Sequence, residues 1–104
     1  MVITYDKEYL QELYESGSCK NKKYRFQNSV IKKYQKRVDT LIAATRIEDL
    51  FVFNSLNFEA LKGKESTYSI RIDYSYRLEF EIHSKQTEPI ITICKIIDIT
   101  NHYQ

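Results

Sequence analysis

Two arginines stand close together in the stretch YSIRIDYSYRLEF, residues 68–80. Apolar and polar residues alternate on both sides of Tyr74, which predicts a β-hairpin that turns there. In this register Arg71 lies directly opposite Arg77. Because like charges that face each other across antiparallel strands are unfavourable, the register calls for nearby carboxylates or a bound anion.

The predicted hairpin has one apolar face and one polar face. The polar face carries Thr67, Ser69, Arg71, Arg77, Glu79 and Glu81. Two guanidinium groups that converge on one surface suit a phosphate, since each offers a pair of parallel donors. The alternative is that Glu79 and Asp73 form ordinary surface ion pairs with the arginines. The hairpin alone leaves both interpretations open.

Three further residues could act at the same polar face. Lys62 precedes Gly63 in a flexible segment that enters the hairpin, so its ammonium group could reach the arginines. His102 and Tyr103 follow the last predicted strand, and these side chains can transfer or position protons. A solvated tail is the alternative for the terminal pair.

Motifs for several other chemistries are missing from the sequence. It contains no serine–histidine–carboxylate spacing, glycine-rich phosphate loop, HExxH motif or acidic metal cluster. If the protein is an enzyme, we therefore expect it to work without a metal or other cofactor, through side-chain cations and proton transfer.

Half of the sixteen lysines and arginines lie between residues 20 and 37, with no acidic residue among them. They are Lys20, Lys22, Lys23, Arg25, Lys32, Lys33, Lys36 and Arg37. This uneven charge suggests a polyanionic partner, nucleic acid first. The alternative is a solvated basic helix face.

The elements that must position these residues change in character along the chain. A short strand near Val2, a helix over residues 7–15 and a longer helix from Asn28 or Ser29 are predicted first. The second helix has an apolar stripe of Val30, Tyr34, Val38, Leu41, Ile42 and Thr45. Strands follow from about Ser66, and IITICKII is apolar on both faces, as expected in the middle of a sheet.

The sequence therefore predicts an α+β fold, with two N-terminal helices packed on a twisted antiparallel sheet and a short N-terminal strand at its edge. The 104 residues suit one domain, residues 1–104. No signal peptide or membrane-spanning run is recognisable, so we expect a cytoplasmic protein. Cys19 and Cys94 are interpreted as reduced thiols, with Cys94 buried in a strand.

The order of these segments resembles the RelE/ParE superfamily of toxins from type II toxin–antitoxin systems, and in particular its HigB-like branch. The similarity is strongest in LKGKESTYSIRIDYSYRLEFEI, which resembles the LKG, aromatic-Ser-Ile and aromatic-Arg-Leu-x-Phe pattern of the family. The ending IDITNHY is similar to the usual family ending, although many members end Tyr-His rather than His-Tyr.

The resemblance implies a ribosome-dependent endoribonuclease that cuts mRNA in the ribosomal A site by attack of the ribose 2′-OH, without a metal. By position, Lys62, Arg77 and the His102–Tyr103 pair match the catalytic residues of the family. Arg71 matches less well, because Asp73 stands where HigB-like sequences place a second basic residue. The basic block would dock on ribosomal RNA, and a cognate antitoxin would be the second partner.

Two other functions fit the same residues. A ParE-like protein would share the fold but inhibit DNA gyrase. A non-catalytic nucleic-acid or protein binding module would use the basic surface only for docking.

Overall fold

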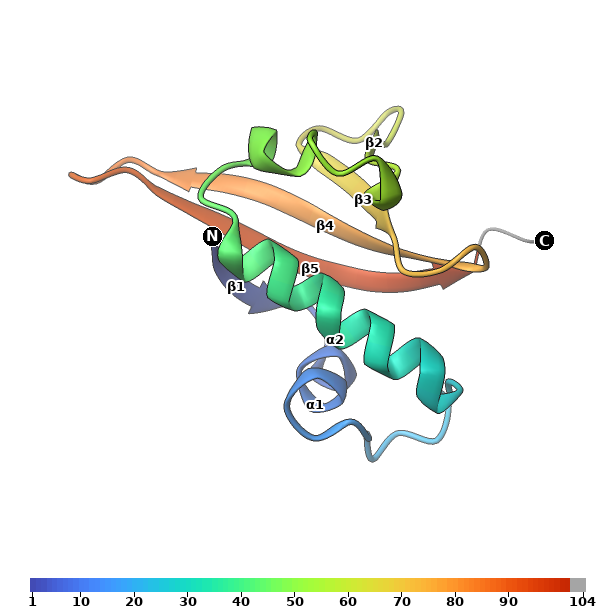
Figure 1. Cartoon of the computed structure of the whole chain (residues 1–104). Helices are drawn as coiled ribbons and strands as arrows, with labels where there is room; N and C mark the ends of the chain where they lie inside the picture. Colours follow the sequence, from blue (N-terminus) through green and yellow to red (C-terminus); the bar gives the residue numbers. More distant parts are fainter. Residues whose placement is uncertain (102–104) are drawn as a thin grey trace.

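The computed structural model describes residues 1–101, and its helices and strands follow the predicted order (Figure 1). The strands are β1 (Val2–Tyr5), β2 (Glu59–Ala60), β3 (Thr67–Arg71), β4 (Tyr76–Lys85) and β5 (Ile91–Asn101). The helices are α1 (Glu8–Ser16) and α2 (Asn28–Ala43), and two 3₁₀ turns follow them, η1 (Ile47–Leu50) and η2 (Asn54–Leu56).

The strands form one sheet in the order β1-β5-β4-β3-β2. Neighbouring strands are antiparallel except for β1, which pairs with β5 in parallel, so the sheet is mixed. The α+β fold with an N-terminal edge strand is confirmed. The doubly apolar strand β5 lies inside the sheet, between β1 and β4, as its sequence predicts.

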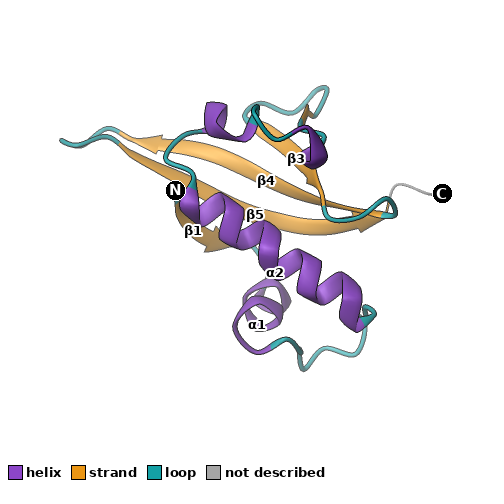
Figure 2. Cartoon of the chain, viewed as in Figure 1, coloured by secondary structure: helices purple, strands orange, loops and turns teal. Residues whose placement is uncertain are grey.

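Both helices pack on one face of the sheet (Figure 2). Helix α1 ends at Gly17, whose positive φ of 78° allows its N–H to donate to the carbonyl of Leu13 at 3.0 Å. In α2 the buried residues are Val30, Tyr34, Val38 and Leu41. Ile42 is exposed and Thr45 lies beyond the helix, so the predicted apolar stripe was too long at its end.

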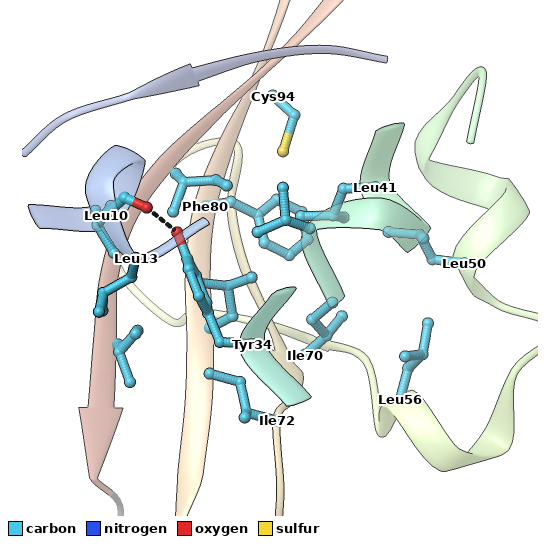
Figure 3. Packing of buried hydrophobic residues seen from close by; sticks show 14 of the residues in the cluster. Leu10, Leu13, Tyr34, Leu41, Leu50, Leu56, Ile70, Ile72, Phe80 and Cys94 are labelled. Atoms are coloured by element: carbon cyan, nitrogen blue, oxygen red, sulfur yellow. Dashed lines mark hydrogen bonds between the residues drawn. The ribbon is translucent and has the colours of Figure 1, made fainter. Parts of the chain in front are cut away.

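The core joins the two helices to the middle strands. Phe80 of β4, Ile70 of β3 and Cys94 of β5 lie in one cluster with the buried residues of α2, and each is fully buried (Figure 3). The hydroxyl of Tyr34 donates to the carbonyl oxygen of Leu10 at 2.7 Å, which satisfies a polar atom that would otherwise be costly to bury. This contact fixes α2 on α1, and with it the lysines that α2 presents to solvent.

Candidate functional site

The β3–β4 hairpin has the register that the sequence predicts. Arg71 pairs with Arg77, and Tyr68 pairs with Phe80. Asp73 fixes the turn, because its Oδ1 atom accepts hydrogen bonds from the main-chain N–H groups of Ser75 at 2.8 Å and Tyr76 at 2.9 Å. Asp73 therefore organises the backbone of the turn.

Arg77 is buried, with 7% of its surface exposed. Its Nε donates to the hydroxyl of Ser69 at 2.9 Å, and its Nη2 donates to the carbonyl oxygens of Ser69, at 3.1 Å, and Asn57. Glu59 lies 3.8 Å from Nη2. The groups that compensate this arginine are thus Ser69, Asn57 and Glu59, and not the Glu79 and Asp73 of the ion-pair interpretation.

The pKa of Arg77 reflects this environment. Burial is the largest influence and lowers the pKa, Glu59 raises it, and the neighbouring guanidinium of Arg71 lowers it again. Arg71 is only half-buried. The two arginines therefore lie close together as predicted, but Arg71 is the one that solvent reaches more easily.

Cations from two distant parts of the sequence meet beside the hairpin turn. A groove of about 520 Å³ is lined by Lys33, Lys36 and Arg37 of α2 and by Arg71 of β3, together with Ser55 and Asp73. Arg37 Nε donates to the main-chain carbonyl of Arg71 at 2.7 Å. We name this groove the cationic groove.

A second hollow adjoins the same turn. Its volume is about 390 Å³, and Arg25, Phe26, Tyr76 and Asn101 line it. Asp73 and Tyr74 line both hollows. Asn101 pairs with Tyr76 at the end of β5, so the described chain ends beside the turn. His102 and Tyr103, which follow Asn101 in sequence, lie outside the described residues.

Lys62 lies at the other end of β3. It is exposed in the loop that precedes the strand, whereas Arg71 is the last residue of the strand. A strand from Thr67 to Arg71 spans roughly 13 Å. The backbone of Lys62 is therefore a strand length away from the cationic groove.

The residues of the basic block do not all lie at one site. Arg25, Lys33, Lys36 and Arg37 line the two hollows beside the hairpin turn. Lys20 instead lines a hollow with Lys7, Glu8, Glu12 and Tyr24. Lys22, Lys23 and Lys32 are exposed. Aromatic stacking fixes the loop between the helices, since the rings of Tyr9 and Tyr24 are 3.7 Å apart.

Sequence reasoning missed the aromatic segment around η2. Phe51, Val52 and Phe53 are all largely exposed, and a groove of about 340 Å³ is lined by Phe51, Phe53 and Phe58 with Asn54 and Asn57. The run FVFN within a predicted connection was the available signal, because three consecutive apolar residues rarely stay exposed without a use.

Within residues 1–101, no three His, Cys, Asp or Glu side chains are grouped closely enough to hold a metal ion. In the same part of the chain, neither helix combines the length and the apolar character needed to cross a membrane.

Comparisons with known proteins agree with this geometry. The fold is similar to that of a YoeB/ParE toxin from Agrobacterium tumefaciens, with a TM-score of 0.55 and 15% identity over 99% of this chain and 100% of the other. A search of curated proteins finds no match. The model of the HigB-like toxin family, described as the RelE-like toxin of type II toxin–antitoxin system HigB, matches residues 3–94.

The chain therefore belongs to the HigB-like family of RelE-like toxins. As a toxin of a type II system, it has a cognate antitoxin as its partner. The matched range includes Lys62, Arg71 and Arg77 but ends before His102 and Tyr103.

Proposed function

We propose that this toxin is a ribosome-dependent, metal-independent endoribonuclease. It cuts mRNA by attack of the RNA's own ribose 2′-OH on the adjacent phosphate. The observation that carries the proposal is the cationic groove, in which Lys33, Lys36 and Arg37 of α2 meet Arg71 of β3. Such a cluster of cations can hold an RNA phosphate.

The chemistry requires few groups. The 2′-oxygen attacks the adjacent phosphorus and loses its proton to a base, and the 5′-oxygen leaves with a proton from an acid. The products are a 2′,3′-cyclic phosphate and a 5′-hydroxyl. Negative charge grows on the non-bridging oxygens in between, so positioned cations lower the barrier.

The roles follow from exposure. Arg71, half-exposed at the groove, contacts the phosphate, and the buried Arg77 opposite it on β4 supplies a fixed positive charge. His102 and Tyr103 remain the candidates for proton transfer. Lys62 would contact the RNA further along, given its place at the other end of β3. The ribosome would align the mRNA, since an open groove orders a flexible strand poorly by itself.

A non-catalytic binding module is favoured by one observation. Arg77, the arginine that best matches the family motif, already donates to Ser69 and Asn57 and is buried. In such a module Arg71 would serve only to bind RNA.

Primer extension on a reporter mRNA in a purified translation system tests the proposal. Wild-type protein should give cuts that vanish when ribosomes are omitted and fall sharply with Arg71→Ala. Lys85→Ala is the matched control, because Lys85 is an exposed cation at the far end of β4. Intact mRNA in every lane would reject the nuclease. In cells that produce the protein, DNA damage signalling with intact mRNA would instead support gyrase inhibition.

A further inference from the structure

We name the groove lined by Phe51, Phe53, Asn54, Asn57 and Phe58 the aromatic groove. It lies around η2, beside the cationic groove. Ser55, the middle residue of η2, lines the cationic groove, whereas Asn54, the residue before it, lines the aromatic groove. One short turn of the chain thus separates the two hollows, and Figure 1 shows it alongside β3. A ligand that crosses η2 would contact cations on one side and phenyl rings on the other.

We propose that the aromatic groove binds an unpaired nucleobase of the RNA strand whose phosphates lie in the cationic groove. This inference rests on the proposed function, because it takes RNA as the occupant of the cationic groove. Single-stranded RNA combines a charged backbone with flat bases, and its binding sites combine cations with aromatic platforms.

The groove is rigid on one side. The ring of Phe51 meets the edge of Phe58 at 5.0 Å, and Phe58 stacks on Tyr68 at 5.3 Å. Tyr68 in turn lies 6.2 Å from the buried ring of Phe80. Contacts with Phe58, and through it with Tyr68 and the core, therefore hold the ring of Phe51 in place, while 56% of the surface of Phe51 is exposed to solvent. A preorganised ring loses little conformational entropy when a base stacks on it.

The polar lining also suits a base. Asn54 and Asn57 carry amides, each with donors and an acceptor, that can pair with base edges. An apolar protein segment in the same place would leave these amides without partners, which is costly on burial. The carbonyl of Asn57 accepts from Arg77, so the aromatic groove also adjoins the buried arginine of the candidate site.

Phe53 is the residue to change, because 51% of its surface is exposed and it lines the groove. The probe is a short single-stranded RNA that carries one 2-aminopurine, compared with the same RNA with an abasic site there. Phe53→Ala should weaken binding of the base-containing RNA roughly five- to hundredfold and leave affinity for the abasic RNA unchanged. Phe53→Leu, which keeps apolar surface but lacks a ring, should show the same loss.

Val52→Ala is the control, since Val52 is 75% exposed but does not line the groove; it should bind like the wild type. The inference is wrong if Phe53→Ala binds both RNAs as the wild type does, if it weakens both equally, or if Phe53→Leu restores full affinity. The last result would mean that apolar surface at this position is sufficient and that no base stacks on the ring.

The two proposals can fail separately. If Lys33→Glu with Lys36→Glu abolishes RNA binding while Phe53→Ala does not change it, the cationic groove stands and the nucleobase site is rejected. If Phe53→Ala selectively loses the base-containing RNA although the wild type cuts no mRNA on ribosomes, the nucleobase site stands and the nuclease is rejected.

Discussion

The Nε atom of Arg37 donates a hydrogen bond of 2.7 Å to the main-chain carbonyl of Arg71, which joins the middle of α2 to the last residue of β3. Burial lowers the pKa of Arg37, as expected for a guanidinium that leaves water to make a structural contact. Although it lies within the basic block, Arg37 thus holds the hairpin beside the helix. This bond links the two elements that supply the cations of the groove.

Replacing Arg37 should therefore destabilise the fold. Arg37→Ala leaves the half-buried carbonyl of Arg71 without its charged donor. We expect the free energy of unfolding to fall by about 1.5–3 kcal/mol. Urea denaturation followed by circular dichroism measures it. Lys36→Ala, next to it on the exposed face of α2, is the control and should change stability by less than about 0.5 kcal/mol. If Arg37→Ala and Lys36→Ala change the free energy of unfolding equally, the hydrogen bond from Arg37 does not contribute to stability.

Arg77 should matter for stability as well as for activity. Arg77→Met keeps much of the apolar stem but leaves the carbonyl of Asn57 and the hydroxyl of Ser69 without their donor. We expect a loss of about 2–4 kcal/mol, measured by chemical denaturation. Arg71→Ala, its cross-strand neighbour, should cost far less because Arg71 is half-exposed. If Arg77→Met is as stable as the wild type, the buried network is not structural.

Asp73 should act through the turn. Asp73→Ala removes the acceptor of two main-chain N–H groups, which we expect to cost about 1 kcal/mol and to lower Tm by about 4–8 °C in a domain of this size. Asp73→Asn retains a side-chain oxygen and should recover most of the loss. Scanning calorimetry separates the two, and an unchanged Tm for Asp73→Ala would contradict this role.

The two cysteines should differ in reactivity. Burial raises the pKa of the Cys94 thiol to about 12, so it stays protonated and covered at pH 8, whereas Cys19 is partly exposed. Because the thiolate is the reactive form, iodoacetamide at pH 8 should add one group to the native protein and two only after unfolding. Mass spectrometry counts the adducts. Rapid double labelling of the native protein would place Cys94 closer to solvent than its burial indicates.

Periodicity was sufficient to predict most of the fold. The alternation around Tyr74 gave the hairpin register, because a slip of one residue would place the apolar face in water. The segment IITICKII is apolar on both faces, which indicated a strand inside the sheet. The parallel pairing of β1 could not be predicted, since Val2–Tyr5 is too short to carry a signal for direction. The end of the apolar stripe was predicted wrongly because Ile42 fits the period, yet it is exposed whereas Leu41 and Ala44 are buried.

The candidate site was predictable only in part. The sequence brings Arg71 and Arg77 together through the hairpin, which is a local relationship. It cannot reveal that Arg77 is buried by contacts with Asn57, or that Arg37 turns toward Arg71, because both depend on packing between distant segments. For the same reason the basic block is continuous in sequence, but only Arg25, Lys33, Lys36 and Arg37 of it line the hollows beside the hairpin turn.

This uneven placement leads to the last prediction, which concerns the cations. Reversing charge in the cationic groove, with Lys33→Glu and Lys36→Glu, should raise the protein concentration needed for ribosome-dependent cleavage by tenfold or more, to judge from the steep salt dependence of phosphate contacts. The same reversal at Lys20 and Lys22 should have a smaller effect, since Lys20 lies beside Glu8 and Glu12. Cleavage titrations at two salt concentrations measure both pairs, and unchanged thermal unfolding controls for folding. Equal losses would mean that the whole basic block docks on RNA as one surface; no loss in either pair would reject docking through these lysines.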